Sequence, residues 1–194
     1  MIDFTKALLK AESFHADNAL PAVSDEEVNT EIVKIAEKHG YKPSKQVVEP
    51  IRAYLSGYGV LLSGEAGIGK TFLMKALGCR LYRVEDIADY GLREISKWYE
   101  WTDGNNLCID DLGAEGVVSE YGAKDDVMKM VIAHRAERQK GRTSITTNLD
   151  SDKIAERYGD RTLSRILGMC KPFRMEGISM RKPEQQAKES DEQS

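Results

Sequence analysis

The sequence predicts an α/β fold in which helices cover both faces of a central parallel sheet. Short apolar stretches alternate with helical stretches from residue 59 onward, as in parallel sheets with crossover helices. A glycine-rich loop, residues 64–69, separates the first of these strands from the next helix. Two later strands end in polar side chains, at Asp110 and Asn148. The alternation gives the fold class, and the loop and strand ends carry the candidate site.

The composition indicates a soluble globular protein of one domain with a small appendage. Of its 194 residues 41% are hydrophobic and 31% are charged, and no apolar run approaches the roughly 20 residues that span a bilayer. The N-terminus lacks the basic start and apolar core of a secretion signal. Three widely spaced cysteines, Cys79, Cys108 and Cys170, argue against a zinc site or a disulfide framework. We therefore expect a cytoplasmic protein without a membrane partner.

The first 50 residues predict a small helical segment. Ser24 followed by Asp25, Glu26 and Glu27 has the pattern of a capping box, and apolar residues recur at helical spacing up to residue 36. Gly40 and the proline at position 43 end this helix. A second helix is predicted within residues 44–56, kinked or begun near the proline at position 50.

Beyond residue 58 the first four predicted strands are each followed by a predicted helix. Apolar runs predict strands over residues 59–62, 79–84, 106–113, 143–149 and 170–181, the last as a strand or a hairpin. Helical spacing predicts helices within residues 71–81, 92–101, 123–141 and 150–167, with Gly141 ending the third and a break near Gly159 in the fourth. The polar residues 182–194 predict a disordered tail.

The glycine loop predicts a nucleotide triphosphate site. Gly64, Gly69, Lys70 and Thr71 match the pattern GxxxxGK[ST] between a strand and a helix. Glycines let backbone N–H groups turn toward phosphates, and the helix N-terminus adds a positive dipole. We expect Lys70 to contact the β- and γ-phosphates and Thr71 to ligate Mg²⁺. The residues expected to contact ATP are Gly64, Glu65, Ala66, Gly67, Ile68, Gly69, Lys70, Thr71 and Phe72.

Two acids and an amide at strand ends complete the predicted site. Asp110 and Asp111 follow the apolar residues 107–109, so Asp110 is expected to hold Mg²⁺ and Asp111 to orient the attacking water. Asn148 ends the next strand, where its side chain can report whether a γ-phosphate is present. A turn that begins with paired acids is the alternative, and the neighbouring glycine loop disfavours it.

The helical stretch after Gly159 carries two arginines with two interpretations. Arg161 and Arg165 are four residues apart and share a face, away from the leucine and isoleucine side chains. One of them could act as an arginine finger that reaches the γ-phosphate of a neighbouring subunit. The alternative is an exposed helix with ordinary salt bridges.

In this order, the glycine loop, the Asp-Asp strand, the "TTN" strand and "DRTLSR" resemble AAA+ ATPases, and within them the DnaC/IstB group of helicase loaders and transposition helpers. The resemblance covers about residues 50–181 and is carried by "LCIDDLGAE", "SITTNLDSDKIAERYGDRTLSRI" and "MEGISMR". It implies a three-layer sandwich that binds ATP and Mg²⁺, with Arg165 as the finger. It also implies Arg161 as a second trans contact or a brace, and Arg181 as the second sensor.

The sequence departs from the AAA+ pattern at two places. Asp111 stands where most AAA+ proteins have Glu, which predicts slow or stimulated hydrolysis, with Glu115 as a fallback. The chain stops where many relatives begin a helical lid, so we expect no C-terminal lid domain. The expected division is a helical segment at 1–50, an ATPase domain at 51–181 and a tail at 182–194.

The resemblance implies a protein that associates head to tail and loads a replicative helicase on single-stranded DNA. The alternatives are an IstB-like transposition helper, a small-molecule kinase and an ATP binder that does not hydrolyse. Residues 129–181 hold 12 Lys/Arg against 6 Asp/Glu, whereas the net charge of the chain is −4. This excess predicts either a phosphate-binding surface or a solvated mixed-charge face. The candidates for DNA contact are Lys129, Arg135, Arg138, Lys140 and Arg142.

Overall fold

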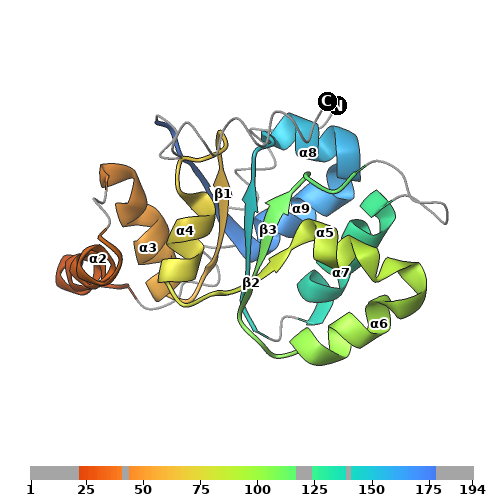
Figure 1. The fold of residues 1–194 in the computed structure, drawn as a ribbon, viewed down its shortest axis with the longest axis horizontal. Coiled ribbons are helices and arrows are strands. Elements are labelled where there is room, and N and C mark those ends of the chain that lie inside the picture. The colour runs from red at the N-terminus through yellow and green to blue at the C-terminus, as the bar shows by residue number, and fades with distance from the viewer. Residues whose placement is uncertain (1–21, 41–43, 117–123, 139–140, 178–194) are drawn as a thin grey trace.

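Five parallel strands form the central sheet of the computed structural model, which describes residues 22–40, 44–116, 124–138 and 141–177 (Figure 1). The strands run in the spatial order β2-β3-β4-β1-β5. Because β4 lies between β1 and β3, its carboxyl end adjoins both the glycine loop and the paired acids. The strands are β1 (Gly59–Ser63), β2 (Arg80–Arg83), β3 (Leu107–Leu112), β4 (Thr143–Thr147) and β5 (Cys170–Arg174).

Helices cover both faces of this sheet and give three layers. In Figure 1 one helical layer lies to the left of the sheet and the other to its right. The left layer consists of α2 (Asp25–His39), a 3₁₀ turn (Lys45–Val47), α3 (Val48–Leu55) and α4 (Lys70–Ala76). The right layer consists of α5 (Val84–Asp89), α6 (Gly91–Thr102), α7 (Lys124–Arg138), α8 (Ser151–Tyr158) and α9 (Asp160–Met169).

The strands are buried on both faces because successive side chains enter different cores. Val60 and Leu62 pack with α2, α3 and α4, whereas Leu61 packs with α5 to α9. Ile109 and Ile145 join Leu61 from the neighbouring strands. This arrangement explains the near-continuous apolar runs of parallel strands, and it confirms the predicted fold class.

Most predicted elements are present, but the helix α5 was not predicted. The capping box is formed, since the Glu27 amide donates to Ser24 Oγ at 3.2 Å and the Ser24 amide donates to Glu27 Oε2 at 2.9 Å. Gly40 ends α2 in the left-handed conformation, with φ 62°. The prediction that a strand continues through Val84 was wrong, because β2 ends at Arg83 and α5 begins at Val84.

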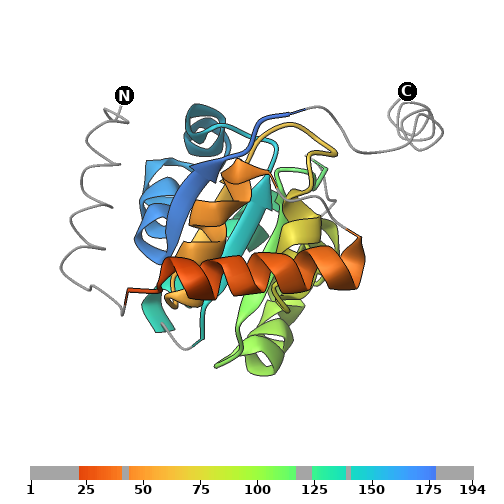
Figure 2. The same cartoon turned by 90° about the vertical axis from the view of Figure 1, so that its left-hand side faces the viewer.

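The helix α2 packs on the layer formed by α3 and α4. It lies across the front of α3 in Figure 2, and Val28 and Ile35 belong to the same apolar cluster as β1 and α4. Arg52 of α3 donates to Asp25 Oδ1 at 2.6 Å and to the Val23 carbonyl at 2.9 Å. The boundary predicted at residue 50 falls inside α3, and the division into domains stays a prediction.

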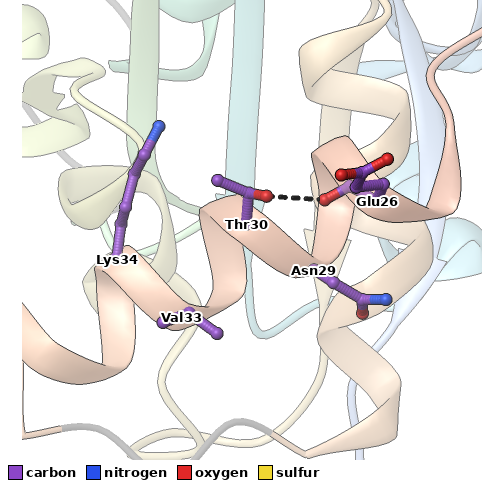
Figure 3. Close-up of a pocket in the computed structure, with 5 residues that line it drawn as sticks. All are labelled: Glu26, Asn29, Thr30, Val33 and Lys34. Atoms are coloured by element: carbon purple, nitrogen blue, oxygen red, sulfur yellow. Dashed lines mark hydrogen bonds between the residues drawn. The ribbon is translucent and has the colours of Figure 1, made fainter.

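An open hollow of about 550 Å³ lies against α2 (Figure 3). Within it the Thr30 hydroxyl donates to the Glu26 carbonyl, and Val33 leaves 52% of its surface exposed. Its lining residues, Glu26, Asn29, Thr30, Val33 and Lys34, lie outside the predicted nucleotide site.

Across the part of the chain that the structure describes, no helix has the length and apolar character needed to cross a bilayer.

Candidate nucleotide site

The glycine loop follows β1 in a conformation that requires glycine. Gly64, Gly67 and Gly69 have φ values of 139°, 81° and 99°, a region that other residues rarely adopt. A Cβ atom at Gly64 would lie 2.2 Å from the carbonyl oxygen of Met175. Met175 continues β5, and its amide donates to the Ser63 carbonyl at 2.8 Å. The backbone of the loop therefore passes too close to this neighbour for a side chain.

Lys70 connects the loop to the end of β4. Its side chain is buried, and Nζ donates at 2.7 Å to each of three oxygens, the carbonyls of Gly64 and Glu65 and Oδ1 of Asn148. The predicted phosphate-binding lysine and the predicted sensor amide are thus in direct contact. This contact follows from the strand order, because β4 pairs with β1.

Thr71 and Asp110 meet in a way that fits Mg²⁺. The Thr71 hydroxyl donates to Asp110 Oδ1 at 2.9 Å, and hydroxyl and carboxylate oxygens are ligands that suit Mg²⁺. No group of three or more His, Cys, Asp or Glu side chains that could hold a metal occurs in the described ranges. Because Mg²⁺ usually completes its shell with waters and substrate phosphates, this pair fits an ion that arrives with the nucleotide.

Asp111 occupies a strained position at the end of β3. Its φ is 58°, a left-handed conformation that costs an L-residue about 1–2 kcal/mol. The pairing of β3 with β4 shifts register between Ile109 and Leu112, so the chain bends at the two acids. The side chain of Asp111 is partly exposed, whereas that of Asp110 is buried. Because of this bend, the two neighbouring acids lie in different environments.

The hydroxyl groups of β4 were missed as site residues by the sequence reasoning. Thr146 donates to Asp110 Oδ1 at 2.6 Å and accepts from the Asp111 amide at 2.9 Å. Thr147 donates to the Leu112 carbonyl at 2.6 Å. The strand "TSITT" is buried at every position, and buried hydroxyls need hydrogen-bond partners. Hydroxyl side chains in a central strand were the signal that could have identified these contacts.

Glu115 is not the fallback catalytic acid that the sequence suggested. Its side chain is fully buried and accepts from the Gly113 amide at 3.0 Å and from the Tyr158 hydroxyl. Arg157 lies 3.5 Å from Glu115 Oε1 and donates to the carbonyls of Gly113 and Glu115. These contacts fasten the turn after β3 to α8, which leaves the carboxylate without access to a substrate.

The predicted trans arginines lie on α9. Arg165 Nη2 donates to Glu137 Oε1 on α7 at 2.8 Å, and 24% of the Arg165 side chain is exposed. Arg161 is exposed, so both arginines lie on the side of α9 that solvent reaches. Arg181, the predicted second sensor, lies outside the described residues.

The loop side chains have different surroundings. Glu65 and Ala66 are exposed, whereas Ile68 is buried beneath the loop. The ring of Phe72 packs edge-on against His39 of α2, with centroids 5.5 Å apart. The Phe72 side chain therefore contributes to packing against α2.

The predicted DNA-contact set is wrong for two of its arginines. Arg135 is buried, and its guanidinium donates to the Thr143 hydroxyl and to backbone carbonyls of the loops beside α7. Burial lowers the pKa of Arg135. Arg142 donates to the Tyr54 carbonyl, and its Cζ atom lies 3.9 Å from the centroid of the Tyr54 ring. These arginines are engaged within the fold, where they donate to carbonyls at the ends of the helices α3 and α6.

Among the described residues, the other members of the predicted DNA-contact set do not form a basic surface. Lys129 pairs with Asp126 at 3.0 Å, and Arg138 is exposed at the end of α7. Lys140 lies outside the described residues. The positive excess of residues 129–181 is therefore partly internal to the fold.

Comparison with known proteins finds a similar curated protein at low identity. No family model matches the chain. The replicative helicase loader DnaI of Bacillus subtilis is 26% identical, over 66% of this chain and 49% of DnaI, so the chain spans about half the length of this curated relative.

Solved structures confirm the fold. The crystal structure of the DnaC helicase loader superposes with a TM-score of 0.56 at 21% identity, covering 71% of this chain and 95% of that chain. AMPPCP-bound DnaA from Aquifex aeolicus superposes with a TM-score of 0.53 at 16% identity, covering 78% of this chain and 53% of that chain.

Proposed function

We propose that this chain, which resembles the DnaC-like AAA+ ATPases, binds and hydrolyses ATP in order to place a replicative helicase on single-stranded DNA. One observation carries the nucleotide part of the proposal. Lys70, Asn148, Thr71 and Asp110 come from three separate parts of the chain and are joined by hydrogen bonds at one edge of the sheet. This is the edge at which α/β sheets bind ligands.

Each of these side chains has a role in the proposed reaction. Lys70 holds the β- and γ-phosphates, and Thr71 and Asp110 hold Mg²⁺, which neutralises phosphate charge when it is bound. Asp111 orients the attacking water. Because Asp is one methylene shorter than Glu, we propose that hydrolysis is slow until a partner or DNA stimulates it. Asn148 contacts Lys70, so it is placed to respond when a γ-phosphate engages that lysine.

The arginines of α9 are proposed to complete a neighbouring site in a head-to-tail assembly. Arg165 is the proposed finger and Arg161 a second contact or a brace. Since Arg165 pairs with Glu137 within the same chain, reaching a neighbour's phosphate requires that this ion pair opens. The γ-phosphate, with its higher charge density, is the stronger acceptor for a bidentate guanidinium.

The helicase partner is proposed from sequence similarity to DnaI. DNA binding is proposed from the neighbours, one of which is a replication initiator DnaA bound to single-stranded DNA. The segment that precedes residue 51 is proposed to dock the helicase, and the protein is proposed to act in the cytoplasm.

Nucleotide binding is tested by Lys70→Ala, with Lys75→Ala as a matched control on the exposed face of the same helix α4. Because Lys70 supplies the positive charge that is proposed to hold the β- and γ-phosphates, we expect its loss to weaken the binding of a fluorescent ATP analogue by about 100-fold or more. The control should bind normally. Equal affinity in Lys70→Ala and wild type would contradict the proposal.

The partner and the shared site are tested with Asp111→Asn, which should bind ATP without hydrolysing it. Tagged and expressed in its native cell, this variant should retain a replicative helicase, whereas recovery of a transposase would favour the transposition helper. Mixed with Arg165→Ala, it should restore part of the turnover, because each protein supplies what the other lacks. A mixture that stays inactive would argue against sites shared between subunits.

A further inference from the structure

We infer that Thr146 is a positioning residue that holds both acids of the nucleotide site through one hydroxyl group. The inference rests on the proposed ATPase function and adds a residue to its machinery. Thr146 lies in β4, between the loop strand and the acid strand, and its surface is fully buried. It has no predicted contact with nucleotide, metal or water, so its effect is exerted through Asp110 and Asp111.

The Thr146 hydroxyl makes two hydrogen bonds with β3, one as donor and one as acceptor. It donates its hydrogen to Asp110 Oδ1 at 2.6 Å and accepts the Asp111 amide hydrogen at 2.9 Å. A hydroxyl has one hydrogen and two acceptor positions, so both bonds are satisfied together. The same Asp110 oxygen accepts from Thr71 at 2.9 Å. Thr146 of β4 and Thr71 of α4 thus both hold the same carboxylate oxygen.

The need for such a brace arises from the bend in β3. At Asp111 the chain has φ 58° and the ladder with β4 loses its register, so the Asp111 amide is diverted from a regular ladder bond. Thr146 supplies the acceptor that the ladder does not. Strained backbone persists where the surroundings determine it, and here the hydroxyl links the strained residue to the metal-binding one.

The next residue of β4 supports the same bend from the adjacent position. Thr147 donates to the Leu112 carbonyl at 2.6 Å and accepts from the Leu149 amide at 3.0 Å. Neither of these two bonds, however, reaches Asp110 or Asp111. The assignment to Thr146 therefore predicts an effect on the reaction, whereas Thr147 supports the backbone beyond it.

The test compares Thr146→Val, which keeps the shape and removes the hydroxyl, with Thr146→Ser, which keeps the hydroxyl. Ser144→Ala is the matched control, because Ser144 is a buried hydroxyl on the same face of β4 that accepts from the Val60 amide at 3.2 Å, away from the acids. A hydrogen bond to a charged group is worth enough to change a rate by about 10- to 100-fold. We expect kcat to fall by that factor in Thr146→Val with KM for ATP nearly unchanged, and Thr146→Ser to recover most of it.

A second readout does not depend on turnover. Amide hydrogen exchange of Asp111, measured by NMR, should quicken by about 10-fold or more in Thr146→Val, because its acceptor is gone. Exchange at Asp111 should remain slow in Thr146→Ser and in Ser144→Ala. Faster exchange together with lower kcat is the expected result.

Two results would overturn the inference. One is unchanged exchange at Asp111 in Thr146→Val, which would show that the hydroxyl does not hold this residue. The other is an equal fall of kcat in Ser144→Ala and Thr146→Val, which would assign the effect to general loss of strand stability. A wild-type protein without turnover contradicts the proposed ATPase instead, and the exchange measurement still decides whether Thr146 holds the acid.

Discussion

Replacing Arg135 with Met should destabilise the fold without directly removing a nucleic-acid contact. Arg135 lies on α7 with 3% of its surface exposed. Its guanidinium donates at 2.8 Å to the Thr143 hydroxyl and at 2.9 Å to each of the Thr102 and Asn105 carbonyls. Weaker bonds of 3.2 and 3.5 Å reach the carbonyls of Gly141 and Arg142. This side chain joins the end of α6 to the start of β4.

The magnitude follows from which acceptors water can reach after the change. Thr102 and Thr143 are buried, so losing the Arg135 donor costs about 1–3 kcal/mol at each of these acceptors. Asn105 and Gly141 are exposed, so their carbonyls can bind water instead. Met also relieves the cost of burying a charge. We therefore expect the free energy of unfolding to fall by about 2–4 kcal/mol, out of the 5–15 kcal/mol usual for a domain.

Urea denaturation measures this loss. With a slope of about 2 kcal/mol per molar urea, the midpoint should fall by about 1–2 M. Arg138→Met is the matched control, since it removes one positive charge from an exposed position on the same helix and should change stability by less than about 0.5 kcal/mol. Binding of an oligo(dT) strand to each folded variant separates the two roles.

The reasoning would be refuted by a variant that keeps its stability and loses DNA. If Arg135→Met unfolds at the wild-type urea concentration while its affinity for oligo(dT) falls below that of Arg138→Met, the guanidinium faces nucleic acid. The internal contacts described for Arg135 would then not be those of the protein in solution.

Three other predictions concern groups whose environment is set by the fold. Glu115→Ala should lower the free energy of unfolding by about 3–5 kcal/mol, because it removes the buried carboxylate that accepts from the Gly113 amide and the Tyr158 hydroxyl and pairs with Arg157. Normal stability with abolished turnover would restore a catalytic role. The backbone hydrogen bond from Ser24 lowers the pKa of Glu27. The stability advantage of wild type over Glu27→Gln should therefore be complete above the pKa of the unfolded chain, about 4.3, and should vanish as the pH falls through the lower pKa of the folded protein. A difference in unfolding midpoint that does not depend on pH would contradict this. Burial raises the pKa of the Cys79, Cys108 and Cys170 thiols, so a thiol reagent should label them only after denaturation, and rapid labelling of the native protein would count against the packing.

The candidate site residues that the structure brings together are those whose spacing implies a backbone geometry. The glycine loop, Lys70 and Thr71 follow from a local pattern between a strand and a helix, and the acids from their place after an apolar run. Their contact with Asn148 depends on β4 lying between β1 and β3. Local spacing cannot specify that order, because strand neighbours are chosen by long-range pairing.

The residues that sequence reasoning misassigned are charged groups with internal partners. Arg135 and Glu115 have side chains typical of surfaces, yet each is buried among groups supplied by distant parts of the chain. The missed helix α5 begins directly at the end of β2, without a loop to mark the change. In each instance the deciding contacts are tertiary, so charge and periodicity alone gave the wrong environment.

The hydroxyl-rich strand β4 also limits how this protein can be engineered for heat resistance. By strand propensity and burial, exchanging its threonines and serine for valine is an obvious stabilising design. These side chains hold their neighbours by hydrogen bonds, so exchange at Thr146 should lower kcat, and exchange at Thr143 or Thr147 should leave a buried partner without its bond. A thermostable version should instead draw its substitutions from the outer helices, where Val33 and Leu55 leave apolar surface to water.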